Sequence, residues 1–106
     1  MKTGEIWLAQ LDPTVGSEIR KTRPCVVISP PEMHNFLRTA IVAPMTTGAH
    51  PAAFRIPLTF QGKSGLILLD QIRTLDKTRL LKRVGALRPA TLAQTLQILQ
   101  AVFAPS

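Results

Sequence analysis

The sequence predicts a mostly β domain of α+β type that ends in one α-helix. Nine prolines and six glycines divide the 106 residues into short runs rich in Val, Ile and Leu, the spacing typical of strands and turns. The last run has a helical period, because apolar side chains recur at intervals of four, three and four residues, at Leu92, Leu96, Leu99 and Phe103. Pro89, just before them, is a favoured first residue of a helix.

Six strands are expected between the turn residues. They cover residues 5–11, 25–29, 39–45, 53–58, 65–69 and 82–87. In the fourth strand Phe54, Ile56 and Leu58 share one face, and Arg55 between them points outward. The fifth strand is apolar throughout, as expected of a strand buried on both faces.

Turns, a cap and a loop complete the expected order of elements. Residues 12–16 end the first strand, and residues 17–23 form an exposed basic loop. Residues 62–65 are expected to turn, and Asp76 is expected to cap one helical turn over 76–80. The apolar face of the terminal helix is expected to belong to the core.

Length and composition indicate one domain, 1–106, with a single modest core. Apolar residues make up 45% and charged residues 18% of the chain, which is typical of a folded protein. The single cysteine, Cys25, excludes an intrachain disulfide, and no apolar stretch has the form of a secretion signal or a membrane span. We expect a reduced, cytoplasmic protein that gains stability by self-association.

The charge balance points to polyanions or acidic partners. Thirteen Lys and Arg against six Asp and Glu give a net charge of +7. The alternative interpretation is a surplus that serves solubility alone. Because the basic residues are scattered along the chain, any polyanion site must be assembled by the fold.

The sequence carries no pattern of metal or nucleotide-binding chemistry. His34 and His50 are isolated and stand beside turn residues, so we expect both to face solvent. Cys25 lies in a run of Val and Ile, which predicts a buried, inert thiol. No clustered ligands and no Gly-rich phosphate loop occur, so no metal and no cofactor are expected.

Three groups of polar residues remain as candidates for chemistry: Arg23-Pro24 at the end of the basic loop, Thr46-Thr47 at a strand end, and Asp70-Gln71 with Arg73. Each also has a purely structural interpretation. Arg23 fits a surface charge, Thr46 a turn hydroxyl bonded to the backbone, and Asp70 an ion-pair partner of Arg73.

Five motifs give the chain a resemblance to the MazF/PemK (Kid, ChpB) family of toxins from type II toxin-antitoxin systems. They match in order and spacing over nearly the whole chain: Gly4-Glu5-Ile6-Trp7, Leu11-Asp12-Pro13-Thr14-x-Gly16-Ser17-Glu18, Thr22-Arg23-Pro24, Pro44-x-Thr46-Thr47 and Asp70-Gln71-x-Arg73-Thr74-x-Asp76. The resemblance implies a small SH3-like, CcdB-like half-open β-barrel with a C-terminal helix. It also implies a twofold homodimer.

The activity that the resemblance implies is sequence-specific, metal-independent cleavage of single-stranded mRNA. Such an endoribonuclease leaves 2′,3′-cyclic phosphate and 5′-hydroxyl ends and thereby inhibits translation and growth. The implied partner is an acidic antitoxin of the MazE/PemI kind, which suits a chain of charge +7. Toxin and antitoxin would form a hetero-oligomer that binds DNA, and no membrane is involved.

The resemblance also implies the roles of three residues. Arg23 matches the family's essential arginine and Thr46 its essential threonine, and both suit the stabilisation of phosphate charge. Asp70 matches an acidic residue used in proton transfer, which makes it a candidate general base. The sequence departs from the PemK-type pattern at Leu68, where an arginine is usual, and at Ser17, where a histidine is usual.

The expected RNA-binding residues lie in the basic loop and beside the candidate catalytic residues. They are Ser17, Glu18, Arg20, Lys21, Thr47, Gln71 and Arg73. With four Phe, one Trp and no Tyr, stacking of bases on aromatic side chains is expected to contribute little.

Two other functions are compatible with the same fold. One is a CcdB-like toxin that binds DNA gyrase and has no nuclease activity. The other is a regulatory module that has lost activity, an interpretation that the departures at Leu68 and Ser17 leave open. Arg23 together with Thr46 favours the nuclease.

Overall fold

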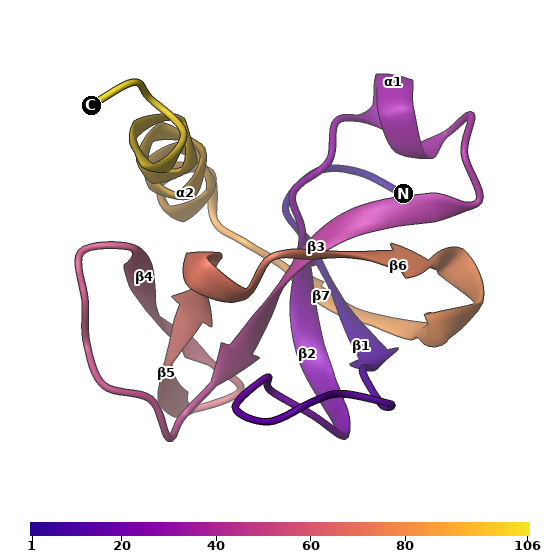
Figure 1. Cartoon of the computed structure of the whole chain (residues 1–106), viewed down its shortest axis with the longest axis horizontal. Helices are drawn as coiled ribbons and strands as arrows, with labels where there is room; N and C mark the ends of the chain where they lie inside the picture. Colours follow the sequence, from indigo (N-terminus) through magenta and orange to yellow (C-terminus); the bar gives the residue numbers. More distant parts are fainter.

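A computed structural model describes all residues, 1–106, and confirms a mostly β fold with a terminal helix (Figure 1). The elements in chain order are β1 Glu5–Gln10, β2 Thr22–Val27, α1 Pro31–His34, β3 Thr39–Thr46, β4 Arg55–Phe60, β5 Lys63–Leu68, the 3₁₀ turn η1 Leu69–Gln71, β6 Arg73–Asp76, the 3₁₀ turn η2 Lys77–Arg79, β7 Leu80–Ala86 and α2 Pro89–Val102. None of the helices has the length and apolar character needed to cross a membrane.

The strands form one curled antiparallel sheet in the order β4-β5-β3-β2-β1-β7. β3 is the strand that joins its two parts, and it crosses the centre of Figure 1. The first half of β3, Thr39–Val42, pairs with β6, whereas Met45 and Thr46 at its end pair with β5. Because β3 changes partner along its length, the sheet curls into a half-open barrel.

The central strands are buried on both faces, so the domain has two clusters of core residues and not the single core expected. On β2, Cys25 and Val27 face the first cluster, and Val26 between them faces the second. β3 divides in the same way, with Val42 in the first cluster and Ala43 in the second. Alternation along a strand sends successive side chains to opposite faces, which explains why residues 25–27 of β2 and 40–45 of β3 are all apolar.

The face through which the terminal helix packs overlaps the predicted one only in part, since Leu92 and Leu99 contact the rest of the domain but Leu96 and Phe103 do not enter the core. Thr95 is its one fully buried residue, and Ile98 and Leu99 pack on the second cluster. Leu96 instead lines an open apolar groove, and Phe103 beyond the helix end is 70% exposed. The helix has only Ala, Thr and Gln between its apolar residues and no charged side chain to mark a solvent face. The period of the leucines alone therefore could not predict which face packs on the sheet.

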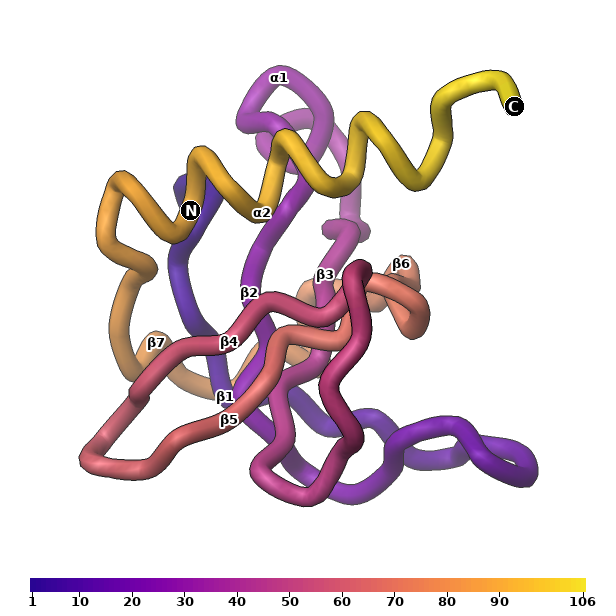
Figure 2. The backbone as a smooth tube through the Cα atoms, turned by 90° about the vertical axis from the view of Figure 1, so that its left-hand side faces the viewer, coloured from indigo at the N-terminus to yellow at the C-terminus, as the bar shows by residue number.

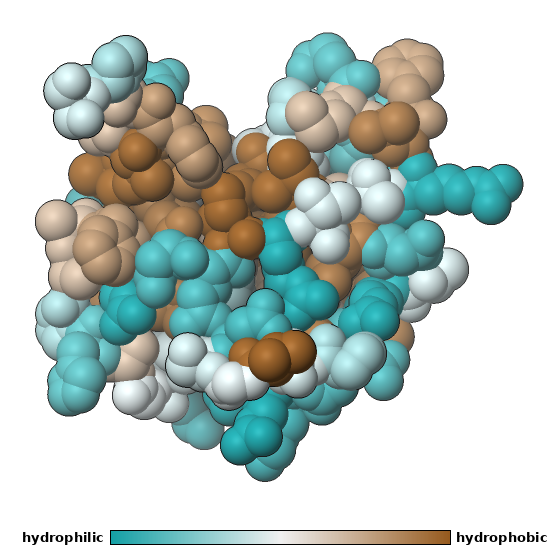
Figure 3. Space-filling model, viewed as in Figure 1, coloured by the Kyte–Doolittle hydropathy of each residue, from teal (hydrophilic) through white to brown (hydrophobic).

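This groove lies between α2 and the segment that leads into α1. Figure 2 shows α2 running across one end of the sheet, and Figure 3 shows apolar surface between α2 and α1. Ile28 and Pro30 line the groove opposite the helix, and its volume is about 580 Å³.

Several element boundaries differ from the predicted ones. β2 begins at Thr22, so the end of the basic loop is itself strand. The turn between β4 and β5 is only Gln61 and Gly62, both with positive φ, and not residues 62–65. β6 was not predicted. The cap at Asp76 is confirmed, because its carboxylate accepts from the Thr78 amide at 2.9 Å, a bond that holds the pKa of Asp76 below its ordinary value.

His34 is fully buried, and the prediction that it faces solvent is wrong. Its Nε2 lies 2.9 Å from the Met1 carbonyl, which can only accept, so Nε2 carries the proton. Nδ1 then accepts from the Ser29 hydroxyl at 2.9 Å, and that hydroxyl oxygen accepts from the Ile41 amide. His50 is exposed and Cys25 is buried, both as predicted, and burial raises the pKa of the Cys25 thiol to about 12.

Replacing His34 with Leu is expected to lower the free energy of unfolding by about 1–3 kcal/mol, because the proton of the buried Ser29 hydroxyl and the Met1 carbonyl each lose a hydrogen-bond partner. Urea denaturation measures the change, with His50→Leu as the control on an exposed histidine. Equal unfolding free energies for the two variants would contradict the structural role of His34.

Candidate functional site

One surface pocket contains both residues of the first candidate pair. Arg23 of β2 and Thr46 at the end of β3 line the same cavity of about 230 Å³. Their neighbours in its wall are Pro24, Met45, Thr47, Leu58, Phe60, Gln61, Lys63 and Gly65. We call this cavity the first pocket. Arg23 and Thr46 are 23 positions apart in the sequence, and the pairing of β2 with β3 brings their strands together.

The hydroxyl of Thr46 is held at the point where β3 ends. Its oxygen accepts from the Gly48 amide at 3.2 Å, so the hydroxyl proton is free to donate outward. β5 approaches closely at Gly65, where a Cβ atom would lie 3.0 Å from the Thr46 carbonyl oxygen. The absent side chain of Gly65 therefore leaves space for the backbone of Thr46.

Arg23 keeps most of its donors available to a ligand. Its Nε donates to the Arg20 carbonyl at 3.1 Å, which ties the guanidinium to the basic loop. The two terminal nitrogens make no hydrogen bond and no ion pair within the chain. A partly buried guanidinium with free terminal donors suits bidentate binding of a phosphate group.

The charges of the first pocket are all positive. Its charged wall residues are Arg23 and Lys63, and no carboxylate lines it. Sequence reasoning missed Lys63 because it was assigned to the turn at 62–65. The correct signal was the pair Gln61-Gly62, since a two-residue turn places Lys63 in a strand opposite Phe60.

Asp70 lies in a separate cavity, which we call the second pocket. It has a volume of about 310 Å³, and it is lined by Ser17, Glu18, Ile19, Asp70, Gln71, Ile72 and Arg73. The candidate residues are therefore divided, because Arg23, Thr46 and Thr47 line only the first pocket. Arg20 and Lys21 are exposed and line neither.

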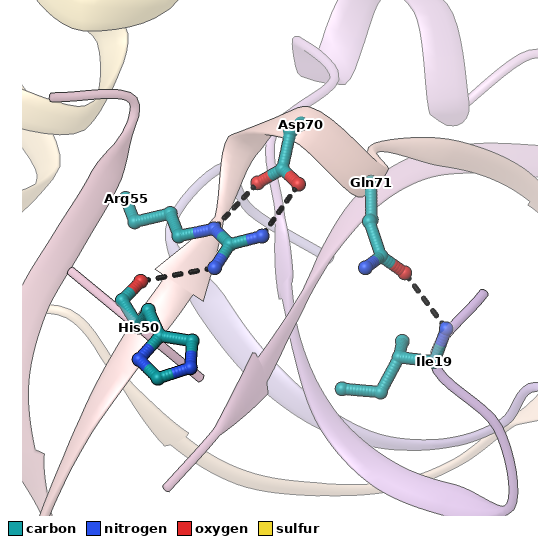
Figure 4. Close-up of polar contacts among 5 residues, drawn as sticks. All are labelled: Ile19, His50, Arg55, Asp70 and Gln71. Atoms are coloured by element: carbon teal, nitrogen blue, oxygen red, sulfur yellow. Dashed lines mark hydrogen bonds and ion pairs between the residues drawn. The ribbon is translucent and has the colours of Figure 1, made fainter. Parts of the chain in front are cut away.

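Asp70 forms an ion pair with Arg55 and not with Arg73. Arg55 Nε and Nη2 donate to the two carboxylate oxygens at 3.1 and 2.9 Å, and Nη1 donates to the His50 carbonyl (Figure 4). Arg55 stands opposite Leu68 in the β4–β5 register, so a guanidinium reaches Asp70 from the neighbouring strand. Hydrogen bonding to Arg55 holds the pKa of Asp70 below its ordinary value.

Three side chains from the segment after β5 anchor the β1–β2 loop. Gln71 accepts from the Ile19 amide at 2.7 Å, as Figure 4 shows, and Arg73 donates to the Leu11 carbonyl at 3.1 Å. Arg79 donates to the Asp12 carbonyl at 2.7 Å. Gln71 and Arg73, predicted to bind RNA, thus also shape the loop that forms one wall of the second pocket.

No group of three or more His, Cys, Asp or Glu side chains is placed to hold a metal ion. The chemistry that the site offers comes from guanidinium, ammonium, hydroxyl and carboxylate groups.

The fold has counterparts among solved structures. An endoribonuclease from Mycobacterial species, solved in complex with its cognate antitoxin, superposes with a TM-score of 0.82 and covers 100% of this chain and 98% of that chain. At 18% sequence identity this likeness establishes the fold.

Sequence comparison identifies the family. Residues 2–103 match the profile described as PemK-like, MazF-like toxin of type II toxin-antitoxin system. Endoribonuclease PemK of Escherichia coli is 40% identical over 81 residues, which are 72% of this chain and 61% of PemK, less than two thirds of its length. Endoribonuclease MazF of Staphylococcus epidermidis is 36% identical over 90 residues, 79% of this chain and 75% of MazF. The chain belongs to the PemK-like, MazF-like toxin family.

The Arg55–Asp70 pair predicts a specific pH dependence of stability. Because the folded-state pKa of Asp70 is lowered, ionised Asp70 stabilises the fold above its ordinary pKa, and this contribution is lost as the pH falls through the lowered value. The contribution is small, since the two side chains remain 20% and 30% exposed.

We therefore expect Asp70→Asn to lower the unfolding free energy at neutral pH and to match the wild type in strong acid. Urea denaturation over a pH series measures this difference. Glu32→Gln, which removes an exposed carboxylate without a hydrogen-bond partner, is the control. The same pH dependence in both variants would show that the pair contributes nothing.

Proposed function

We propose that the chain is the toxin of a type II toxin-antitoxin system and cleaves single-stranded RNA without a metal ion or cofactor. The observation that carries the proposal is that Arg23 and Thr46 share a pocket whose charged groups are all cationic. Membership of the toxin family and relatives named endoribonucleases support it.

The first pocket supplies what a phosphodiester needs during cleavage. Once its proton is removed, the 2′-oxygen attacks phosphorus and forms a crowded phosphorane with extra negative charge. The P–O5′ bond then breaks and the 5′-oxygen takes up a proton from the protonated base or water, which leaves 2′,3′-cyclic phosphate and 5′-hydroxyl ends. The free nitrogens of Arg23 bind the nonbridging oxygens, and the Thr46 hydroxyl donates a further hydrogen bond. Arg23 does not remove the 2′-hydroxyl proton, because a guanidinium stays protonated in proteins.

Asp70 is the proposed general base. Its pairing with Arg55 keeps the carboxylate ionised at neutral pH but also weakens it as a proton acceptor. This role requires the scissile phosphate to bind between the two pockets, with Arg23 and Thr46 on its one side and its 2′-hydroxyl within hydrogen-bond reach of Asp70 on the other.

Base recognition is assigned to the β1–β2 loop and the second pocket. Ser17, Glu18, Arg20 and Lys21 are exposed on the loop. Gln71 uses its carbonyl oxygen on Ile19, which leaves its amide nitrogen to donate to a base edge. In the first pocket the Thr47 hydroxyl is a further donor. In the second pocket Arg73 has guanidinium nitrogens that make no hydrogen bond within the chain and can donate to RNA.

The proposed partners are an acidic antitoxin and a second copy of this chain. The family is defined by toxin-antitoxin systems, and a net charge of +7 complements an acidic segment. We place the toxin in the cytoplasm, where mRNA is its substrate. A CcdB-like gyrase inhibitor is not favoured, because the curated relatives are named endoribonucleases.

The first experiment is cleavage of a long single-stranded RNA by purified protein in EDTA, with cut sites and end groups mapped. We expect discrete cuts with cyclic phosphate ends. Arg23→Ala and Thr46→Val are each expected to reduce kcat by about 100-fold or more, as for other groups that bind transition-state charge. Asp70→Asn is expected to reduce kcat with little effect on KM.

Two variants control for charge and for loss of a hydroxyl. Arg38→Ala and Thr74→Val change exposed residues that line neither pocket, and both are expected to cleave like the wild type. Intact RNA across varied sequences would overturn the proposed activity, and full activity of the Arg23 and Thr46 variants would overturn the site.

Antitoxin and RNA are expected to compete. A saturating amount of the cognate antitoxin should abolish cleavage, and rising salt should weaken both interactions because each depends on the basic surface. Cleavage assays with a titration of antitoxin test this expectation. Unchanged cleavage in a complex shown to form would refute the competition.

A further inference from the structure

The β4–β5 hairpin presents one continuous row of side chains to the first pocket. Residues directly opposite each other in an antiparallel pair project from the same face. The register pairs Ile56 with Ile67, both in the core, and two residues further along it pairs Leu58 with Gly65. The next pair on this face is Phe60 with Lys63. The row thus leads from the core to the pocket rim, and Lys63 is its outermost member.

The position of Lys63 is fixed by its hairpin. Gln61 and Gly62 have φ values of 51° and 76°, as in a two-residue turn with both central residues left-handed, and Lys63 follows at once. In Figure 2 the tip of this hairpin projects from the molecule. The ammonium group of Lys63 therefore extends from a strand paired along its whole length and not from a loose loop.

Lys63 lies within reach of a strand bound at Thr46. Gly65 touches the Thr46 backbone, since a Cβ on Gly65 would lie 3.0 Å from the Thr46 carbonyl oxygen. Lys63 is two residues away on the same strand, a separation of about 7 Å. Lys63 is therefore displaced along the strand from the contact with Thr46 while it still lines the same pocket, so it faces the part of a bound RNA strand next to the anion held by Arg23 and Thr46.

Neither cation of the first pocket is neutralised within the chain. The ion pairs of the protein are Arg55 with Asp70 and Arg83 with Glu5. Lys63 is exposed and makes no hydrogen bond through its side chain, and no carboxylate lines the pocket. Leu58 and Phe60 add apolar surface to the wall of the same pocket.

We propose that Lys63 is a further substrate-binding residue, which contacts the phosphodiester next to the one held by Arg23 and Thr46. This inference rests on the proposed function. Because Lys63 lies one residue pair beyond the contact with Thr46, it binds a flanking phosphate and not the scissile one. It therefore contributes to binding of the strand, and the charge that develops in the transition state is left to Arg23.

The test compares steady-state cleavage and equilibrium RNA binding of Lys63→Gln with those of the wild type. Loss of one phosphate contact to a single strand removes about 0.7 from the slope of log affinity against log salt, which corresponds to roughly fivefold weaker binding near 0.1 M salt. We expect KM to rise by this factor with kcat unchanged. Lys63→Arg should restore KM.

Lys82→Gln is the matched control, because Lys82 is an exposed lysine of β7 that lines neither pocket. It should leave KM, kcat and the salt slope unchanged. Circular dichroism confirms that each variant is folded before the kinetics are read.

Each outcome decides between the two proposals. If the wild type cleaves RNA and Lys63→Gln keeps the wild-type KM and salt slope, the role of Lys63 is refuted and the proposed function stands. A fall in kcat at constant KM would also refute it, since Lys63 would then act on the transition state. If the wild type binds RNA but never cleaves it, the proposed function fails, and the salt slope still decides the role of Lys63. No binding at all overturns both.

Discussion

Burial of the central strands on both faces is the constraint on which the rest of this structure depends. Cys25 and Val26 are adjacent in β2, yet they belong to different clusters of the core, and Val42 and Ala43 divide in the same way on β3. A strand packed from two sides has little freedom to slide or tilt, because a shift of one residue would exchange the two sets of side chains. Arg23 and Thr46 lie at the ends of these two strands, so their backbone positions follow from core packing.

The two pockets differ in how their charges are balanced. In the second pocket the carboxylate of Asp70 is matched by a guanidinium from the neighbouring strand, at 2.9 Å between the closest atoms. The first pocket has no such partner, and its two cations remain available to an external anion. Unneutralised positive charge in a concave site attracts anions, and this difference is why we propose that a phosphate group of the RNA binds in the first pocket.

The approximate positions of six of the seven strands, the terminal helix and the cap at Asp76 could be predicted because they depend on local pattern. The sharing of a pocket by Arg23 and Thr46 was foreseen only through family resemblance, since nothing in the spacing of the two residues brings them together. Lys63, the Arg55–Asp70 pair and the buried His34 depend on strand register and on contacts between distant segments. The predicted face of α2 was only partly right for a related reason. Burial of Thr95 and Ile98 depends on the surface against which the helix packs, and the period of the leucines does not reveal that surface.

The way the β1–β2 loop is anchored separates the position of its backbone from the identity of its side chains. The loop is held by side chains of Gln71, Arg73 and Arg79, which bond to its backbone at Ile19, Leu11 and Asp12. Backbone groups are the same whatever residue carries them, so exposed side chains such as Ser17 and Arg20 can vary without loss of these anchors. Glu18 is an exception, because its carboxylate accepts from the Val15 amide at 2.6 Å within the loop. Under the function that we propose, variation at these positions changes which RNA sequence is bound, while the proposed phosphate-binding pair of Arg23 and Thr46 stays fixed by the core. The architecture is accordingly a scaffold on which new specificities can evolve without loss of folding.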